Sequence, residues 1–536
     1  MEKIITKNNK VLSNKCSGQI ISKKWSFLKN FLLLAVFVSV LSSCMRDLPT
    51  ELEFESYQFE SLDENGGTWT PILIESGDQL LIPTPAPVNS SEYLAELAQV
   101  KNAIQGMSSS QRQNLQRWTN NPVIRWNEIA LELIAKYNLI PGPNPDGSYT
   151  LPNPANPAGP PAFPFAHPPY ASRALAYLSV AQYDGLITAW HYKFQYNRPA
   201  AYQVDSSIPV AYVAQDIPSY PSDGAVIASV SRRVLTAMFP LEAAYLEQKE
   251  KEHLESLLLS GEFVQSDLSA GVKIGTDISA IALQRASSDG MRNAQAPKAV
   301  ADSLANAAFE RFGWKWVNQE SPQRPVGLTP LFGKVRMWNV PNVEATRPGP
   351  PPAIGSPEYE EDVKLLRKYE ENRTPEMRRI ANFWQDGLST YTPPGHWNDF
   401  ANRFIVKYRL NTLRSARTLA YLNMAIMDGG ISCWDTKYYY YYPRPIQMID
   451  GFETITGTPN FPAYTSGHSV FSAAAAEVLA YIFPSEANQV RDWALEAAVS
   501  RVYGGIHWSF DATVGTEQGR NVAQYTIDKA RLDGAD

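Results

Sequence analysis

Three short segments near the C-terminus carry side chains that together could bind a phosphate-like oxyanion. They contain Lys437 with Arg444 and Pro445, then Ser466, Gly467 and His468, and then Arg501, His507 and Asp511. Three cations can neutralise the oxygens of a tetrahedral anion, and a hydroxyl and a backbone amide can donate hydrogen bonds to it. The two histidines are then left for chemistry.

The spacing of these residues resembles a known signature. Lys-x6-Arg-Pro, Ser-Gly-His and Ser-Arg-x5-His-x3-Asp are typical of the superfamily that unites type 2 phosphatidic acid phosphatases with vanadium-dependent haloperoxidases. Segments 461–468 and 505–512 look most like the fungal-type vanadium chloroperoxidases, and the resemblance covers roughly residues 118 to 530. Thr465 departs from the common pattern, which has proline before Ser-Gly-His. This residue shapes a loop, and its side chain is not expected to touch the anion.

The resemblance implies roles for the two histidines. His507 would be the single protein ligand of vanadium, or in a phosphatase the nucleophile that accepts the phosphoryl group. Asp511 follows four residues later, so in a helical segment it would lie one turn away and orient the His507 ring as part of the catalytic set. His468 follows a predicted helix start, and it would act as the general acid and base.

The resemblance also implies which groups hold the anion and which support them. The oxygens of vanadate or phosphate would be bound by Lys437, Arg444, Ser466, Gly467 and Arg501. Lys437 would in addition polarise the bound peroxide. Asp386 would stand behind an anion-binding arginine, although a plain helix end before Gly387 is an equal alternative.

Other residues around these segments leave alternatives open. Phe461 is a candidate wall of the pocket. The run 438–442 holds five tyrosines, which could line the mouth of the pocket or form a packing layer between two bundles. His396 lies in a predicted loop at 393–397 that could approach the substrate entrance.

Composition sets wider limits. The chain has 536 residues, of which 44% are hydrophobic and 19% charged, so it has ample material for a globular core. The formal net charge of -6 gives no reason to expect nucleic acid as a partner. It also makes the cationic cluster more significant, because the rest of the surface would repel an anion.

The N-terminus predicts export from a bacterial cell. In residues 1–44, lysines precede an apolar run at 31–41 that is too short for a comfortable membrane span. The run ends at Cys44 in a pattern that resembles a lipobox. We therefore expect lipidation of Cys44 and a periplasmic or outer-membrane lipoprotein held at the membrane by its lipid anchor only; a plain secretory signal is the alternative. Apart from the lipidated Cys44, Cys433 is then the one cysteine expected in the mature body, so no internal disulfide can form.

The chain also contains an internal repeat with an offset of 244 residues. Segment 173–185 matches 417–429, Lys193 matches Lys437, and Arg198 matches Arg444 after a two-residue gap. Segment 223–225 falls opposite Ser466-Gly467-His468, with Ala225 in the place of the histidine. The Arg501, His507 and Asp511 trio has no recognisable counterpart in the first copy. We therefore expect Lys193 and Arg198 to bind no anion.

Helical periodicity surrounds both copies. Apolar residues recur at three- and four-residue steps in 410–428, where Gly429-Gly430 is a plausible stop, and again in 469–483 and 487–498. Few stretches alternate as strands do. The sequence therefore predicts an all-α protein of two helix bundles related by duplication. The expected order is a signal peptide (1–44), a tether and N-terminal arm (45–117), a degenerate bundle (118–300), a connecting segment (301–375) and a catalytic bundle (376–536).

The preferred hypothesis is a vanadium-dependent haloperoxidase that oxidises halide with hydrogen peroxide at a histidine-bound vanadate, with a small organic molecule as acceptor. The alternative is a PAP2-type acid phosphatase that needs no cofactor and works through a phosphohistidine. A third class is a surface lipoprotein with a relict pocket. The choice of halide, the acceptor and the oligomeric state are not predicted.

Overall fold

The structure, a computed structural model, describes residues 57–210 and 216–535. All secondary-structure elements in these ranges are α-helices or 3-10 helices, and no strand occurs among them. This confirms the predicted all-α fold. None of the helices in the same ranges is long and apolar enough to cross a membrane. The predicted signal peptide and Cys44 lie outside the described residues.

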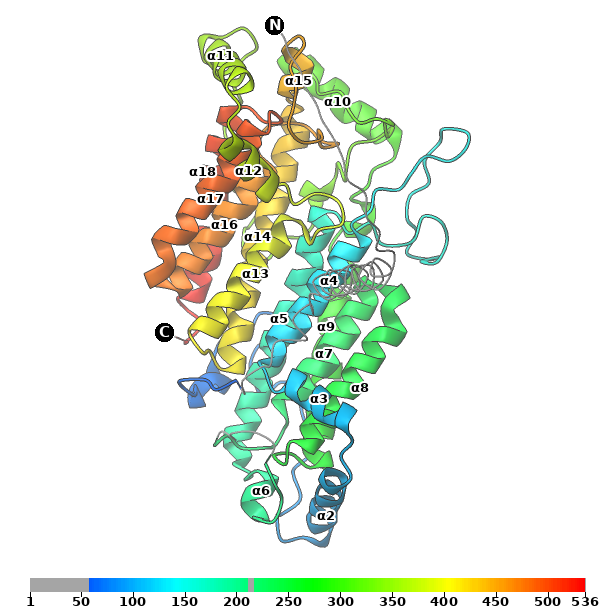
Figure 1. Cartoon of the computed structure of the whole chain (residues 1–536), viewed down its shortest axis with the longest axis vertical. Helices are drawn as coiled ribbons and strands as arrows, with labels where there is room; N and C mark the ends of the chain where they lie inside the picture. The colour runs from blue at the N-terminus through cyan, green and yellow to red at the C-terminus, as the bar shows by residue number, and fades with distance from the viewer. Residues whose placement is uncertain (1–56, 211–215, 536) are drawn as a thin grey trace, which may run out of the picture. The chain divides into compact units, whose positions relative to one another are not determined.

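Two long helices, α5 (Pro168–Tyr196) and α14 (Thr412–Tyr440), pack against each other in the middle of the described part (Figure 1). Each is the central helix of one bundle. The helices packed against α5 are α4 (Pro122–Tyr137), α7 (Asp223–Met238) and α9 (Gln265–Ser287), and α8 (Ala243–Leu259) packs on α7. The helices packed against α14 are α13 (Thr392–Lys407), α16 (Gly467–Ile482) and α18 (Ser509–Ala530), and α17 (Ala487–Tyr503) packs on α16.

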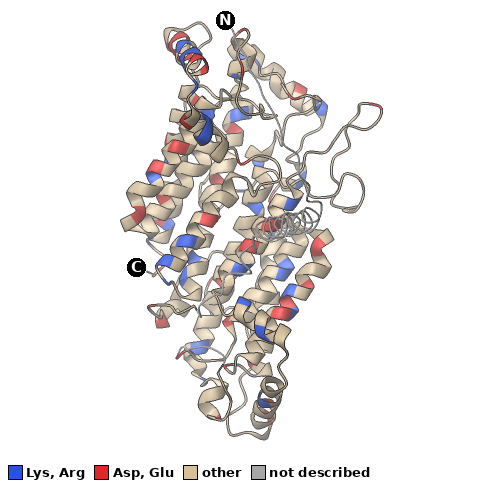
Figure 2. Ribbon diagram, viewed as in Figure 1, with Lys and Arg blue, Asp and Glu red and all other residues tan. Residues whose placement is uncertain are grey.

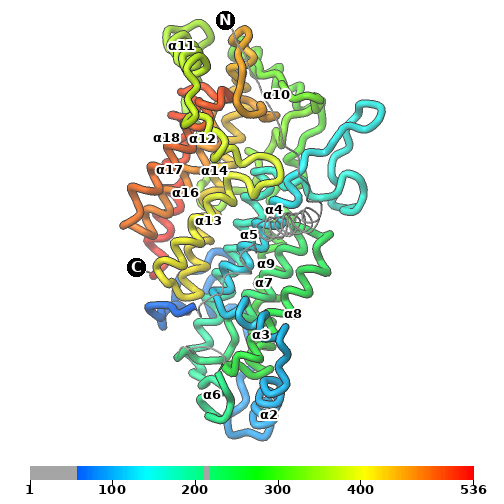
Figure 3. Tube along the Cα trace, in the orientation of Figure 1, coloured from blue at the N-terminus to red at the C-terminus, as the bar shows by residue number. Residues whose placement is uncertain are grey.

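The remaining helices lie before, between or within the bundles. They are η1 (Glu64–Thr68), α2 (Ser91–Gln105), α3 (Ser109–Trp118), α6 (Ala201–Val204), η2 (Pro240–Glu242), η3 (Met291–Asn293), α10 (Lys298–Phe312), η4 (Phe332–Lys334), η5 (Val343–Ala345), α11 (Pro357–Glu371), α12 (Pro375–Phe383), α15 (Pro445–Met448) and η6 (Pro484–Glu486). In the tube of Figure 3, helices α16, α17 and α18 lie on one side of the α5 and α14 contact and helices α7, α8 and α9 on the other.

The bounds of the helices repeat the predicted offset. Helices α5 and α14, α7 and α16, and α8 and α17 start and end 244 residues apart. Each of the two long helices ends in a left-handed residue, Asn197 at φ 47° and Tyr441 at φ 53°. The agreement extends to the ends of elements, which confirms the duplicated architecture.

Buried ion pairs repeat in the same way. Arg173 Nε lies 2.6 Å from Asp289, and Arg417 Nε lies 2.7 Å from Asp533. Both guanidinium groups also donate to a main-chain carbonyl near the end of the last helix of their own bundle. Each pair therefore fastens the first turns of a central helix to the end of α9 or α18.

These ion pairs give a stability prediction. Asp533→Asn should lower the free energy of unfolding by about 3–5 kcal/mol, because it removes the carboxylate charge from the buried ion pair with Arg417. Asp289→Asn should have an effect of similar size, since it removes the carboxylate charge from the buried pair with Arg173. Urea unfolding followed by circular dichroism measures both; a loss below about 1 kcal/mol, typical of an exposed pair, would show that the clamps are not structural.

The two glycines expected to end the helix at 429–430 lie inside α14, so that prediction is wrong. A Cβ at Gly430 would come within 2.7 Å of the Phe471 ring, and one at Gly429 within 3.4 Å of Val470 and Ala474. Small residues here let α16 approach α14 closely. As a result α14 continues for three more turns and carries Lys437 on the same rigid helix.

Polar side chains are buried where the two bundles meet. Asn423 of α14 donates to Ser179 of α5 at 2.9 Å, and also to Asn398 of α13. Asn398 in turn accepts from Asn127 of α4 at 3.0 Å. Charged residues lie mostly elsewhere: in Figure 2 both signs are scattered along the outer helices, with no extended area of one sign in that view.

The tyrosine run at 438–442 has a third role, which neither alternative from the sequence described. The Tyr438 hydroxyl donates to the Leu328 carbonyl at 2.9 Å, and those of Tyr440 and Tyr442 donate to the carbonyls of Pro348 and Pro352 at 2.8 Å. The run therefore anchors the connecting segment to the end of α14. It does not form a layer between the bundles.

Candidate active site

Lys437 lies in the last turn of α14 with its side chain fully buried. Its Nζ donates to the carbonyls of Pro462 and Ala463 at 2.9 and 2.8 Å, and it lies 5.0 Å from the centre of the Phe461 ring. The Phe461 ring therefore lies beside the ammonium, and the carbonyls of the next two residues, Pro462 and Ala463, hold the ammonium in place. An ammonium group has three protons, so one donor remains for a ligand.

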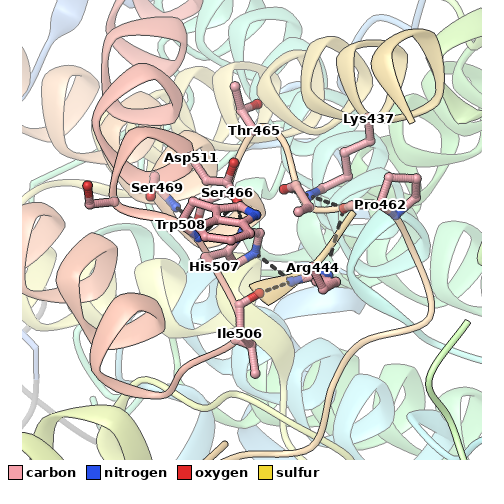
Figure 4. A network of polar contacts seen from close by, with 12 residues as sticks. Lys437, Arg444, Pro462, Thr465, Ser466, Ser469, Ile506, His507, Trp508 and Asp511 are labelled. Carbon is pink, nitrogen blue, oxygen red and sulfur yellow. Dashed lines mark hydrogen bonds and ion pairs between the residues drawn. The ribbon is translucent and has the colours of Figure 1, made fainter. Parts of the chain in front are cut away.

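Arg444, the residue before α15, is also fully buried. Its Nη1 donates to the Ile506 carbonyl at 2.6 Å and lies 3.0 Å from His507 Nε2 (Figure 4). Its Nε donates to the Phe461 carbonyl at 3.1 Å. The guanidinium is therefore fixed by main-chain carbonyls from two loops beside the imidazole of His507.

His507 and Asp511 are in direct contact, although not as neighbours on one helix. His507 precedes α18, and Asp511 caps its first turn: Asp511 Oδ2 accepts from the Trp508 amide at 3.1 Å and lies 2.8 Å from His507 Nδ1. The predicted pairing thus forms through a capping loop. Because guanidinium can only donate, Nε2 facing Arg444 is an acceptor, which places the ring proton on Nδ1 toward Asp511.

Ser466, Gly467 and His468 form the start of α16. The Ser466 hydroxyl accepts from the Ser469 amide at 3.4 Å, so the helix begins two residues before the predicted start at Ser469. Free amides at a helix start favour an anion. His468, the second residue of α16, has a buried Nε2 without a hydrogen-bond partner in the described ranges.

Arg501 reaches the site from the last turn of α17. Its Nη1 donates to the Trp384 carbonyl at 3.1 Å, while its Nε is buried without a partner. Asp386 lies close enough to raise the pKa of Arg501, against the stronger lowering by burial, and its carboxylate contacts His396 Nδ1 at 3.1 Å. Asp386 therefore lies near Arg501, and its role behind an anion-binding arginine stays a prediction.

His396 is placed differently from the prediction. Residues 393–397 form the first turns of α13, where a loop was expected, and the His396 ring is buried and stacked 4.8 Å from Trp384. Its contact with Asp386 could not be read from the sequence, because a histidine ten residues after an aspartate has no local pattern. His396 is therefore a support for Asp386 and does not line an entrance.

The buried groups of the site fit an oxyanion. Burial lowers the pKa of Lys437 to about 7, of Arg444 to about 9 and of Arg501 to about 10. Burial likewise raises the pKa of Asp511 to about 8, against the lowering effect of Lys437 and Arg444. The three desolvated cations would be satisfied by an anion with several oxygens, and the partnerless Nε2 of His468 by a hydroxyl group of the same ligand. In the described ranges no group of three or more His, Cys, Asp or Glu residues could hold a metal cation.

Anion binding should depend on pH through Lys437. An anion beside the ammonium raises the pKa of Lys437 above its free value of about 7, so binding takes up a proton at higher pH. Affinity is therefore highest below pH 7 and should fall by up to about tenfold per pH unit above it. Calorimetric titration with sulfate, whose charge is constant in this range, measures the effect. Lys437→Met should flatten the profile, and a wild-type affinity that does not change with pH would contradict the assignment.

The first half shows the same pocket closed by its own side chains. Asp223 begins α7 as Gly467 begins α16, and its carboxylate lies 3.2 Å from Lys193 Nζ. Arg198 is paired directly with Asp267, which caps α9 as Asp511 caps α18. The first half therefore carries its own counter-anions, whereas within the described ranges no carboxylate forms an ion pair with Lys437 or Arg444.

Two details of the predicted correspondence are corrected by the helix starts. At the common offset, Gly224 stands opposite His468, where Ala225 was expected. Asp511 does have a counterpart, namely Asp267, although Phe263 replaces His507. The sequence missed Asp267 because no histidine or arginine accompanies it in the first copy.

Comparison with known proteins finds relatives that match parts of this chain. Residues 417–528, which span α14 to most of α18, match the PAP2 superfamily model. Vanadium chloroperoxidase from Curvularia inaequalis is 22% identical over 229 residues; the match covers 27% of this chain and only 38% of that enzyme's length. The resemblance predicted from the sequence motifs is thus confirmed.

Solved structures share the fold. A bacterial vanadium-dependent iodoperoxidase superposes with a TM-score of 0.56 at 23% identity, covering 69% of this chain and 93% of that one. An apo bacterial vanadium-dependent chloroperoxidase gives a TM-score of 0.47 at 14% identity, covering 68% and 94%. The first likeness shows that the helical architecture of this chain is that of a vanadium haloperoxidase-like fold.

Proposed function

We propose that this protein is a vanadium-dependent haloperoxidase, which oxidises halide with hydrogen peroxide at a vanadate held by His507. The observation that carries the proposal is the meeting of a neutral imidazole with three buried cations. His507 Nε2 presents its lone pair beside Arg444, in a pocket where Lys437 and Arg501 are also desolvated. The haloperoxidase relatives and the shared fold support this choice of anion.

The residues divide the work of holding the anion. His507 would bind the vanadium centre through Nε2, while Lys437, Arg444 and Arg501 would neutralise its oxygens. The Ser466 hydroxyl accepts one hydrogen bond from the Ser469 amide and can still donate its own proton to the anion. The Gly467 amide at the helix start can donate as well. Bound vanadate would supply Lewis-acid activation of hydrogen peroxide without changing its oxidation state.

Proton transfer would fall to His468. Burial and the charge of Arg501 hold the pKa of His468 well below its usual value, so the ring is neutral and can accept a proton from hydrogen peroxide. Trp434 packs 5.0 Å from Phe461, and together they give the pocket an apolar wall. This wall limits access of water and strengthens the electrostatic interactions within.

The test uses protein lacking residues 1–44, loaded with orthovanadate and then desalted. Oxidation of chloride, bromide and iodide by hydrogen peroxide would be assayed with and without vanadate. Vanadate-dependent oxidation of at least one halide is the expected result, and it would rank the halides. Vanadium lost on desalting with no halide oxidation would overturn the proposal.

A PAP2-type acid phosphatase is the second candidate, because the same His507 lone pair could attack a phosphate ester. The family match to residues 417–528 applies equally to this activity. Hydrolysis of p-nitrophenyl phosphate by the vanadate-free protein, inhibited by vanadate, would favour the phosphatase. If the protein shows neither activity, the remaining candidate is a binding protein with a relict pocket.

We further propose that the protein is exported and anchored by a lipid on Cys44, in the periplasm or on the outer membrane of a bacterium. The support is the lipobox-like ending of the apolar run at 31–41. Labelling of cells with a fatty-acid analogue should mark the wild-type protein and not Cys44→Ala. Equal labelling of both would overturn the assignment.

A further inference from the structure

A second cavity lies in the first half, outside the anion pocket. Its volume is about 790 Å³, which is the size of sites that bury drug-sized ligands. It is enclosed by the proline-rich stretch 141–165, the start of α5, the ends of α7 and α9, and residues 324–329. None of the anion-binding residues of the second half lines it.

Three hydroxyl groups on its lining are buried and have no hydrogen-bond partner. They are Tyr149 Oη, Thr236 Oγ1 and Thr329 Oγ1, and they come from three separate parts of the chain. Buried polar groups without partners are uncommon, because each one loses its bonds to water without a replacement. These three hydroxyl groups border one mostly apolar space, and each could gain a hydrogen bond from a polar atom of a ligand that reached it.

The charged groups on the lining are all cations. Four basic residues line the cavity and no aspartate or glutamate does. Arg173, Lys298 and Arg324 are paired with acids that lie outside the lining. Arg292 is exposed at the rim and has no hydrogen bond or ion pair within the described ranges.

His167 adds a further donor. Its Nδ1 accepts from the Tyr170 amide at 3.3 Å, so in the neutral ring the proton is on Nε2. Burial lowers the pKa of His167 to about 3, which keeps the ring neutral. The polar side chains available to a ligand are therefore donors or hydroxyls, and they match an acceptor-rich group.

We propose that this cavity binds a small apolar organic carboxylate, with the carboxylate beside Arg292 and the apolar part among residues such as Phe163 and Met238. The field of the unpaired Arg292 and the excess of donors select the anion over its neutral analogues. The apolar lining provides most of the affinity. The proposal does not depend on the haloperoxidase reaction.

The cavity adjoins the catalytic half without opening into its pocket. The Leu328 carbonyl accepts from Trp434 Nε1 at 3.1 Å and from the Tyr438 hydroxyl at 2.9 Å, while the Leu328 residue lines the cavity. Trp434 and Phe461 stand between this point and Lys437. Carboxylate binding should therefore be the same with and without vanadate.

The experiment is a calorimetric titration of the protein lacking residues 1–44 with 2-naphthoate and with the matched neutral 2-naphthamide. We expect 2-naphthoate to bind at least about tenfold more tightly. Arg292→Gln should remove this preference by weakening only the carboxylate. Arg336→Gln changes another exposed arginine that does not line the cavity, and it should change nothing.

Ser287→Trp locates the site, because Ser287 is exposed on the rim at the end of α9 and a tryptophan there would block part of the cavity without replacing a core residue. It should abolish binding of both compounds while leaving the melting temperature unchanged. Absence of 2-naphthoate binding to the wild type, equal affinity for both compounds, or binding that survives Ser287→Trp would each overturn the proposal. These outcomes are independent of vanadate loading, so they are separate from a failure of the haloperoxidase assay.

Discussion

A Gly467→Asp variant is expected to fold normally and to lose oxyanion affinity by at least about 100-fold, because a like charge inside the pocket costs several kcal/mol. The first half predicts this result: Asp223, at the position equivalent to Gly467, lies 3.2 Å from Lys193 and takes the place of an external anion. In the variant the new carboxylate should pair with Lys437. Titration with sulfate and with vanadate measures the loss, and halide oxidation should fall with it.

Because a small side chain fits at Gly467, the effect of Gly467→Asp reports the added charge and not a steric clash. A Cβ there would meet nothing closer than the Trp434 ring at 3.7 Å, so a small side chain fits. Gly467→Ala and Gly467→Asn are the matched controls, and each should retain most of the affinity. A Gly467→Asp protein that binds vanadate as well as Gly467→Asn does would show that Lys437 does not face the anion.

Replacement of His507 by phenylalanine should reduce turnover by about 1,000-fold or more, since an essential nucleophile or ligand nitrogen is removed. Phenylalanine is chosen because Phe263 occupies this position in the first half, so the ring volume is tolerated. Without the imidazole, Asp511 would be free to pair with Arg444, as Asp267 pairs with Arg198. Vanadium content after desalting and steady-state assays of both reactions measure the loss.

The corresponding check is whether the fold survives. His507→Phe should keep the wild-type helical content, and His507→Ala should lose as much activity with a lower melting temperature, because it leaves a cavity. Wild-type turnover in either variant would contradict the role of His507 as ligand or nucleophile. Retained vanadium with no turnover would point to a role in the reaction and not in holding the anion.

Much of this site could be predicted because its residues sit in short motifs. Ser466, Gly467 and His468 are contiguous, and the spacing from His507 to Asp511 signals a contact whether a helix or a capping loop provides it. The long helices were predictable from apolar periodicity. The start of α16 was misplaced by two residues because the cap is Ser466 and the predicted start was Ser469.

Other features depend on tertiary packing, which a single sequence does not reveal. Gly429 and Gly430 resemble a helix stop, but they allow the approach of Phe471 and the rest of α16. The partners of the tyrosine run are carbonyls about 90 to 110 residues away in the connecting segment. His396 and Asp386 are likewise brought together by the packing of α13 beneath Trp384.

The contact between Ser179 and Asn423 has a consequence for the origin of the molecule. The two residues are separated by the repeat distance itself, 244 positions, and yet they touch at 2.9 Å. Equivalent positions of two copies meet each other on a two-fold axis, where an isologous interface places a surface against itself. The contact of α5 with α14 therefore has the symmetry of a homodimer, which suggests an ancestor of two identical subunits, each with its own oxyanion site. Fusion into one chain then allowed the two sites to diverge, so that one pairs its cations with its own carboxylates while the other keeps its histidine.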